Sequence, residues 1–489
     1  MTDLILVLDE GTTSTRAFAF DRDGAIVASA SRAITQHFPA SGWVEHDADE
    51  LWTLSRDCIE EVAAAVGVAR IAALGLTNQR ETIVFWDAAT GQPIAPAIVW
   101  QDRRGADLCE RWRADGLEPA VQATTGLVID PYFSASKIAW ALDHWPAIAA
   151  AAAAGTLRLG TVDTWLRFKL TGGVVHATDA TNAARTLLMD LATCTWNAAL
   201  IARFGIPPAA LPAIGDCAGD LGTATIAGRA VPITGAAGDQ HAAAIGQACL
   251  SPGMVKATFG TGTFVLAHAG SAPPVSAHRL LATLAWRIDG VAAYALEGSV
   301  FTAGAAVQWL RDGIGVIASA PETEALARSV ADSGGVVVVP AFTGLGAPHW
   351  RADVRGLITG VTAATTRAHL ARATLAAVVQ QTADLIDALA ADGVVTTRLR
   401  VDGGMVANDW LCQHLADVLG VPVERPRVIE TTALGAAMLA GVGIGWFADL
   451  TEASSMHAVD RVFTPAMTAS DLAAGRARWA HAVRQALTQ

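Results

Sequence analysis

Two short turns rich in glycine and threonine, separated by about half of the chain, constrain this sequence most. The first, residues 9–13, lies between an apolar run at 4–8 and a second β-prone stretch at 17–20. The second, residues 258–263, also lies between two β-prone stretches. Each pattern predicts a β-hairpin whose tip offers backbone amides and hydroxyls, because glycine lets the backbone approach an anion closely. Two facing tips would form a phosphate clamp.

The same order of strands and helices occurs twice along the chain. In the first half, β-like segments alternate with helical stretches such as 48–66, 104–115 and 134–142. In the second half, β-like segments at 254–267, 282–288 and 291–296 come before helical stretches at 367–390 and 407–419. A chain of 489 residues exceeds a single core. With a Ser-Pro-Gly turn at 251–253, the pattern predicts two α/β domains related by duplication, residues 1–250 and 251–489, with a nucleotide between them.

Composition excludes several classes of partner. With 46 acidic and 34 basic residues the net charge is −12, which predicts no binding to nucleic acid or to an anionic membrane surface. The six cysteines are scattered without a CxxC pair, which is typical of reduced thiols in a cytoplasm. The start of the chain, from Met1 through Asp3 into a strand, has no basic or apolar leader, so we expect a cytoplasmic protein without a secretory signal.

One uncharged stretch, residues 431–448, approaches the length of a membrane span. It contains Gly435, Gly441, Gly443 and Gly445, and the last three alternate in a way that ends a helix. We therefore predict a buried helix here and no membrane insertion. The alanine run at 149–154 is predicted to be helical on propensity alone.

Two further segments could carry chemistry. Asp239 follows an apolar strand at 231–234 and stands between Gly238 and Gln240, where a carboxylate could accept a proton from an alcohol or hold a metal ion. It could equally be a helix N-cap, and this segment alone leaves both readings open. Residues 401–408 predict a strand that ends in Asp-Gly-Gly before a helix, either a surface for adenine and ribose or only a turn.

Together these segments resemble the FGGY family of sugar and polyol kinases, and most closely its members that phosphorylate glycerol. The resemblance extends from residue 4 to about residue 446 and includes these motifs: DEGTTSTRA at 9–17, GWVEHD at 42–47, TNQRET at 77–82, IVWQDRR at 98–104, TGLVIDPYFS at 125–134, GTVDTWL at 160–166, AGDQHAA at 237–243, FTGLGAPHW at 342–350 and VDGGMVAN at 401–408. It implies two ribonuclease-H-like, actin-like ATPase domains around a cleft, ATP and Mg²⁺ as cofactors, and phosphorylation of glycerol to sn-glycerol 3-phosphate. It also implies a homodimer or homotetramer.

The resemblance also implies roles for residues of the acceptor site. Asp239 is the catalytic base; the side chains that hold or enclose the alcohol are Arg80, Glu81, Trp100, Tyr132, Gln240 and Phe264. Such a set suits a small triol, which needs a polar partner for each hydroxyl and an apolar wall for its carbons. Purely structural roles are the alternative: Arg80 and Glu81 could form a surface ion pair, and Trp100 and Phe264 could be ordinary core aromatics.

The nucleotide site is implied in the same way. The residues expected to contact ATP are Gly11, Thr12, Thr13, Ser14, Arg16, Thr261, Gly304, Gln308, Gly404 and Asn408, and those expected to hold Mg²⁺, through water, are Asp9 and Asp239. In this scheme Asp239 accepts the proton of a terminal hydroxyl while that oxygen attacks the γ-phosphorus.

The sequence departs from its relatives at a few positions. Glu10, His241 and His349 replace residues of other types, and Glu10 could either face the phosphates or point away; we assign no catalytic role to the two histidines. The loop at 226–231 is short, so we expect no inhibition by a sugar bisphosphate. Two alternatives stay open: a kinase of the same family for another polyol or ketose, such as xylulose or erythritol, and an actin-like or chaperone-like ATPase.

Overall fold

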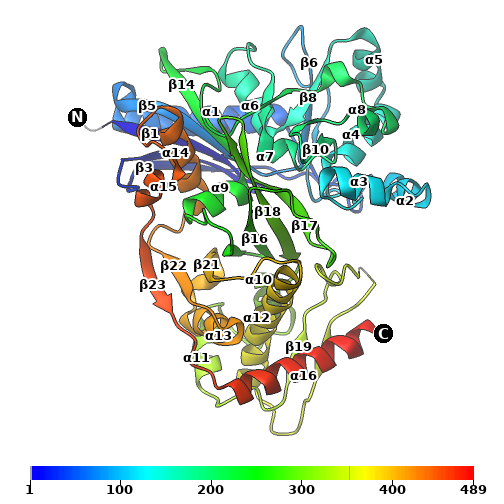
Figure 1. Ribbon diagram of the computed structural model, residues 1–489, viewed down its shortest axis with the longest axis vertical. Helices are drawn as coiled ribbons and strands as arrows, with labels where there is room; N and C mark the ends of the chain where they lie inside the picture. The colour runs from blue at the N-terminus through cyan, green and yellow to red at the C-terminus, as the bar shows by residue number, and fades with distance from the viewer. Residues whose placement is uncertain (1–2, 352, 489) are drawn as a thin grey trace.

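The structure is a computed structural model that describes residues 3–351 and 353–488. Residues 1, 2, 352 and 489, which include the predicted chain start at Met1 and fall within the two predicted domains, lie outside the described residues. Each half of the chain contributes one large mixed sheet with helices against it (Figure 1). The predicted α/β class is confirmed.

The sheet of the first half has six strands in the order β13-β14-β5-β1-β2-β3. Strands β1, β2 and β3 form an antiparallel meander, and β5 and β14 continue it in parallel to β1. The strands are β1 (Leu4–Glu10), β2 (Ser14–Phe20), β3 (Ile26–Ala33), β5 (Ile71–Asn78), β13 (Thr223–Ile226) and β14 (Arg229–Gly238).

The sheet of the second half has seven strands in the order β17-β18-β16-β15-β21-β22-β23. Here β18, β16 and β15 form the antiparallel meander, and β21 and β22 continue it in parallel to β15. The strands are β15 (Met254–Phe259), β16 (Thr263–Gly270), β17 (Leu281–Ile288), β18 (Val291–Val300), β21 (Arg398–Asp402), β22 (Val423–Pro426) and β23 (Val459–Phe463). The two halves therefore repeat one five-strand topology, as duplication predicts.

Both faces of the first sheet are buried, which explains the uninterrupted apolar run at its centre. Side chains alternate between the faces of a strand. Leu4, Leu6 and Leu8 accordingly join the core under helix α1 (Ala48–Val66), whereas Ile5 and Val7 join the core under helix α14 (Thr431–Gly443). Helix α14, orange in Figure 1, thus comes from the C-terminal part of the chain and packs on the N-terminal sheet.

Helix α9 (Asp239–Gly246) lies between the two sheets. It contacts β14 and β5 of the first half and β15, β16 and β17 of the second. The second sheet is covered elsewhere by α12 (Arg367–Ala391) and α13 (Asp409–Leu419). Because α9 begins directly at the end of β14, Asp239 and Gln240 stand at the junction of the two halves.

The remaining helices and strands of the described residues complete the two halves. The other helices are α2 (Ala106–Ala114), α3 (Glu118–Thr125), α4 (Ser134–His144), α5 (Pro146–Ala154), α6 (Val162–Leu170), α7 (Ala180–Ala183), α8 (Ala198–Arg203), α10 (Gly304–Gln308), α11 (Glu322–Arg328), α15 (Leu450–Ala453) and α16 (Ala469–Leu487). The other strands are β4 (Glu45–His46), β6 (Ile83–Asp87), β7 (Ala97–Ile98), β8 (Leu157–Thr161), β9 (Ala177–Asp179), β10 (Met189–Asp190), β11 (Thr195–Trp196), β12 (Ala213–Gly215), β19 (Val337–Val339) and β20 (Leu357–Thr359).

The predicted elements agree with the structure apart from their ends. The strand expected at 231–234 continues to Gly238, and the helix expected from residue 407 begins at Asp409 after a short 3₁₀ turn. The stretch at 431–448 is the buried helix α14, which ends at Gly443. Among the described residues, no helix combines the length and the apolarity that crossing a membrane requires.

Helices α9 and α14 touch through their backbones, which only glycine allows. A Cβ at Gly435 would overlap the carbonyl oxygen of Ala242, and one at Gly246 would overlap that of Thr431. Gly435→Ala should therefore lower the free energy of unfolding by at least about 2 kcal/mol, because the helices must separate. The matched control is Gly475→Ala in α16, where the nearest atom, Gln380 Nε2, is 3.8 Å away; it should be neutral or add up to about 1 kcal/mol. Urea unfolding measures both, and equal effects would contradict the close packing.

Candidate active site

The first predicted turn is the tip of the β1–β2 hairpin. The amide of Gly11 donates to the carbonyl oxygen of Ser14 at 3.0 Å. Gln79, at the end of the neighbouring strand β5, holds the tip from the side, since its backbone amide donates to Glu10 O at 2.7 Å and its Nε2 donates to Gly11 O at 2.8 Å. The tip leaves Thr12 half-buried and Thr13 exposed. The hydroxyls of Thr12 and Thr13 can each donate a hydrogen bond to an anion at this tip.

The second predicted turn joins β15 to β16 and carries Thr261 exposed at its tip. Helix α10 begins against it: the amide of Gly304 donates to Gly260 O at 2.9 Å, and the amide of Ala305 donates to Thr261 O at 3.1 Å. Gly304 has no room for a side chain, because a Cβ would lie 2.5 Å from Gly260 O. The structure thus brings Thr261 and Gly304 together, and Gln308 lies exposed at the far end of the same short helix.

The third glycine turn lies beside the second. Thr258 of β15 pairs with Asp402 of β21, and Gly403 follows with φ 92°, a conformation that favours glycine. Gly404 is exposed and has open space around its Cα. Asn408 caps helix α13 by accepting from the amide of Leu411 at 3.0 Å, so its side chain already has a structural task.

Arg80 and Glu81 are buried at the junction of the two halves. Their exposed fractions are 3% and 1%, so the surface ion-pair reading is wrong. Glu81 has φ 60°, a strained left-handed backbone of the kind found at functional sites. Its carbonyl oxygen accepts from Ser134 Oγ at 3.0 Å.

Two buried residues that the sequence did not single out complete this cluster. Glu297 of β18 binds both nitrogens of the Arg80 fork, Nη1 at 2.5 Å and Nη2 at 3.2 Å. Arg185, just after α7, donates to Glu297 at 3.0 Å and to Glu81 at 2.6 Å. Arg80, Glu81, Arg185 and Glu297 therefore form a closed quartet of alternating charge, called the buried quartet below. Glu297 is its member from the second half.

Within the buried quartet, Arg80 and Glu297 hold each other's charge in place, whereas burial raises the pKa of Glu81. Burial alone would raise the pKa of Glu297, but Arg185 and Arg80 outweigh it and lower that pKa to about 2. Burial opposes the charge of Arg80, yet Glu297 and Glu81 hold its pKa well above the usual value. Both groups are thus ionised throughout the physiological range.

Three aromatic side chains line one side of this cluster. The Trp100 ring packs edge-on against Tyr132, with centroids 5.7 Å apart, and against Phe264, with centroids 6.4 Å apart. All three are half-buried, which leaves part of each ring free to contact a ligand. The indole Nε1 of Trp100 donates to Thr12 Oγ1 at 2.9 Å. That bond ties the aromatic wall to the first hairpin tip.

Asp239 is the first residue of α9, and Gly238 occupies the N-cap position; the N-cap reading of Asp239 is therefore wrong. Its carboxylate lies 3.1 Å from Nε of Arg80 and remains 32% exposed. The next side chain, Gln240, is half-buried and accepts from the ammonium of Lys256, which is buried in β15. The structure thus gathers Arg80, Glu81, Asp239 and Gln240 in one place.

Two neighbouring carboxyls at the end of β1 have different surroundings. Asp9 is ion-paired to Arg16, which also pairs with Glu430. Burial raises the pKa of Asp9 to about 6, against the effect of Arg16, and the negative charges of Glu430 and Asp239 add to the rise. Glu10 points away from the hairpin tip and is fully buried, where it accepts from Ser55 Oγ at 2.6 Å and from Thr15 Oγ1.

A divalent cation fits this chemistry only as a companion of the nucleotide. The described residues hold no group of three His, Cys, Asp or Glu side chains suited to a metal. The negative charge of Asp239 raises the pKa of Asp9, and one or two carboxylates suffice for an Mg²⁺ whose other ligands are phosphates and water.

The other departures from the relatives are two histidines and one short loop. His241 is fully buried, and burial together with Arg80 lowers its pKa well below 6.5, so it is neutral and adds no charge beside Arg80. His349 lines a small cavity with Asp384 and Trp479. The short loop at 226–231 is a tight β-hairpin in which Ile226 pairs with Arg229.

Arg185, Glu297, Lys256 and Gln79 are the site-forming residues that sequence reasoning missed. Glu297 and Lys256 carried one usable signal, a single charged residue inside an otherwise apolar strand, which is rare unless the charge is paired. Arg185 and Gln79 carried none in their local sequence. Their partners lie in segments distant along the chain.

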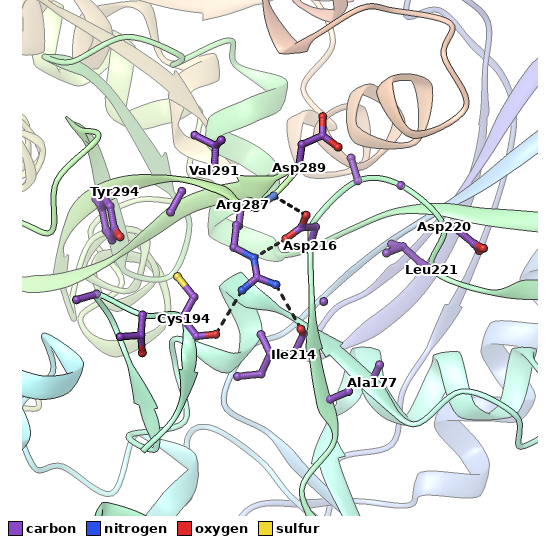
Figure 2. Close-up of a pocket in the computed structure, with 18 of the residues that line it drawn as sticks. Ala177, Cys194, Ile214, Asp216, Asp220, Leu221, Arg287, Asp289, Val291 and Tyr294 are labelled. Carbon is purple, nitrogen blue, oxygen red and sulfur yellow. Dashed lines mark hydrogen bonds and ion pairs between the residues drawn. The ribbon is translucent and has the colours of Figure 1, made fainter. Parts of the chain in front are cut away.

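A separate cavity of about 1030 Å³ lies between the two halves, away from these residues (Figure 2). Arg287 crosses one side of it and has three partners there: it pairs with Asp216 and donates to the carbonyl oxygens of Cys194 and Ile214. None of the predicted site residues lines this cavity. The Arg287 guanidinium therefore joins the two halves beside this cavity.

The comparisons with known proteins agree with this architecture. Residues 4–246 match the N-terminal domain, and residues 255–444 the C-terminal domain, of the FGGY family of carbohydrate kinases. The chain belongs to this family.

Individual relatives differ in how similar they are to this chain. The chain is 54% identical to glycerol kinase of Rhodospirillum rubrum, with 98% of each chain covered. The crystal structure of Plasmodium falciparum glycerol kinase with ADP is similar with a TM-score of 0.95 and 36% identity, covering 100% of this chain and 99% of that one. The crystal structure of xylulose kinase from Rhodospirillum rubrum is similar with a TM-score of 0.88 and 26% identity, covering 99% of this chain and 98% of that one.

The burial of Glu10 makes a testable contribution to stability. Burial raises its pKa to about 8, against hydrogen bonds from Ser55 and Thr15, whereas the ordinary value is 4.5. Between these values the unfolded chain loses this proton while the folded protein keeps it, so stability falls as the pH rises from about 4.5 to about 8. Glu10→Gln cannot ionise and should lose less stability than the wild type between pH 6 and pH 8.5. Urea unfolding at both pH values measures this.

The exposed Glu60→Gln is the matched control for that measurement. It should show the same pH dependence as the wild type. An unchanged dependence in Glu10→Gln would mean that Glu10 is ionised in the folded protein.

Proposed function

We propose that this chain is an ATP-dependent kinase that transfers the γ-phosphoryl group of ATP to glycerol and forms sn-glycerol 3-phosphate. The observation that supports it most is the gathering of Arg80, Glu81, Asp239 and Gln240 against an aromatic wall, at the junction where the two hairpin tips also lie. The full-length similarity to glycerol kinases agrees with it.

The alcohol would bind between the polar side chains and the aromatic wall. Asp239 is the one carboxylate of the polar four that is partly exposed, because Glu81 is buried, so it is the group that takes the proton of the attacking hydroxyl. Nε of Arg80, 3.1 Å away, orients that carboxylate. The buried quartet fixes Arg80 in turn.

The nucleotide would bind with its phosphates between the tips that carry Thr12, Thr13 and Thr261. Ser14, Arg16 and Gly11 belong to the first tip, and Gly304, Gln308, Gly404 and Asn408 surround the second. Mg²⁺, when bound with ATP, neutralises phosphate charge, and Asp9 and Asp239 are the carboxylates that would hold it through water. Separation from water limits loss of the phosphoryl group to hydrolysis.

The rival functions fit the site less well. A kinase for a ketose such as xylulose would not need this set of hydroxyl partners and aromatic rings, and the xylulose kinase structure is less similar than the glycerol kinase structure. An actin-like ATPase would need no alcohol site. We also expect a reducing, cytoplasmic location, which six unpaired cysteines support; the oligomeric state stays a prediction.

One assay separates the three functions. Purified protein with ATP and Mg²⁺ should release ADP at least about 100-fold faster with glycerol than with xylulose, with erythritol or without an acceptor, because a site built for hydroxyls rejects ligands that leave its groups unpaired. Equal release in all reactions would indicate an ATPase. Faster release with another acceptor would reassign the substrate.

Asp239→Asn tests the base. The amide keeps the size of the side chain and a hydrogen bond to the alcohol but cannot take its proton, so kcat should fall by about 10²- to 10⁴-fold while KM for glycerol changes little. Steady-state kinetics measure this. Arg103→Gln, which alters an exposed arginine paired with Asp130, is the control with unchanged kcat; near-normal turnover of Asp239→Asn would remove Asp239 from this role.

A further inference from the structure

Lys256 is a buried cation that the mechanism above does not use. It is fully buried in β15, where its neighbours along the strand are apolar or small. Burial lowers its pKa, the negative charges of Asp402, Asp239 and Glu297 oppose that effect, and the positive charge of Arg80 adds to it. Within the part of the chain that the structure describes, its ammonium has no ion-pair partner, and its hydrogen bond is to Oε1 of Gln240. A buried charge costs stability unless it is paired. The presence of a lysine at this buried position therefore calls for a functional explanation.

The bond decides which way the Gln240 amide faces. An ammonium has three donors and no acceptor, and an amide has one accepting oxygen and two donating hydrogens. Facing Lys256, Gln240 must present its oxygen. Its Nε2 then faces away from Lys256, and in the described residues it has no hydrogen-bond partner.

This orientation complements the groups beside it. Asp239 offers only accepting oxygens, and Nη1 and Nη2 of Arg80 each already donate one hydrogen bond to Glu297, while its Nε is paired with Asp239. The hydroxyl that gives its proton to Asp239 has its donor used, so its oxygen or that of a neighbouring hydroxyl needs a donor. Free amide hydrogens on Gln240 supply one. The reversed amide would instead place a second acceptor next to Asp239.

We propose that Lys256 is a positioning residue that holds the Gln240 amide with its N–H donors toward the acceptor alcohol, and so sets selectivity for a hydroxyl at that place. The proposal rests on the proposed function. Under this proposal, the second half of the chain positions two polar side chains of the acceptor site: Glu297 positions Arg80, and Lys256 positions Gln240.

The test is a double-mutant cycle with Lys256→Met and Gln240→Leu. Each single variant should raise KM for glycerol about 10-fold with kcat lowered less than about 3-fold, since one hydrogen bond to the alcohol is lost in each. The double variant should be no worse than Gln240→Leu, because the two residues act as one unit. Lys169→Met, the same change at a half-buried lysine outside the site, should leave KM unchanged.

Selectivity gives a readout that a purely structural lysine would not move. Relative to the wild type, Lys256→Met should lose about 10-fold in its preference for glycerol over propane-1,2-diol or over propane-1,3-diol, whichever lacks the contacted hydroxyl. Additive effects in the cycle, an unchanged preference over both diols, or a raised KM for ATP in place of glycerol would each overturn the proposal.

A second variant covers the case in which Lys256→Met does not fold. Gln240→Glu keeps the shape of the side chain and a partner for Lys256 but has no N–H donors, so its KM for glycerol should rise as much as that of Gln240→Leu. A wild-type KM in Gln240→Glu would overturn the proposal. Wild-type enzyme that fails to phosphorylate glycerol would instead contradict the proposed function.

Discussion

Four buried side chains of alternating charge hold the centre of this molecule together. Arg80, Glu81 and Arg185 come from the first half and Glu297 from the second. Removing one member would leave an unpaired buried charge, which typically costs about 3–5 kcal/mol. The halves therefore cannot adopt another register at this place without breaking several charged hydrogen bonds.

Much of the acceptor site follows from that constraint. Glu297 accepts from Nη1 and Nη2 of Arg80, and Nε of Arg80 faces Asp239. Strand β14 delivers Asp239 at the start of α9, and α9 fits between the sheets only because Gly246 and Gly435 let it touch α14. Rigid strands and a closely packed helix thus position the reactive carboxylate, which suits a reaction that depends on orientation.

The repeated topology explains why the hairpin tips lie where they do. In each sheet the first two strands form a hairpin whose tip adjoins the end of a parallel neighbour, Gln79 beside the first tip and Asp402 beside the second. Each copy of the duplicated unit forms its hairpin from a local sequence pattern: an apolar run, a glycine turn and a second apolar run. Such patterns are visible in sequence, and the predicted strands and turns accordingly differ from the structure only at their ends.

The long-range partners could not be predicted in this way. Nothing near Arg185 indicates that Glu297, 112 positions later, would neutralise it, and no local rule pairs Lys256 with Gln240. Glu10 is a comparable case: the sequence placed a carboxylate beside a phosphate-binding turn, and only the packing of α1 against β2 provided Ser55 as a buried partner.

The sequence by itself determined the periodic features of this protein, namely the two sheets, their hairpins, the buried glycine-rich helix and the residue types at the site. Local backbone preference and hydrophobic alternation act over a few residues, so they can be read along the chain. Only the tertiary structure decided which buried charges meet, which way Gln240 faces and that Asp239 stands beside Arg80. Those outcomes depend on desolvation and on pairing between segments that become neighbours only when the chain is folded.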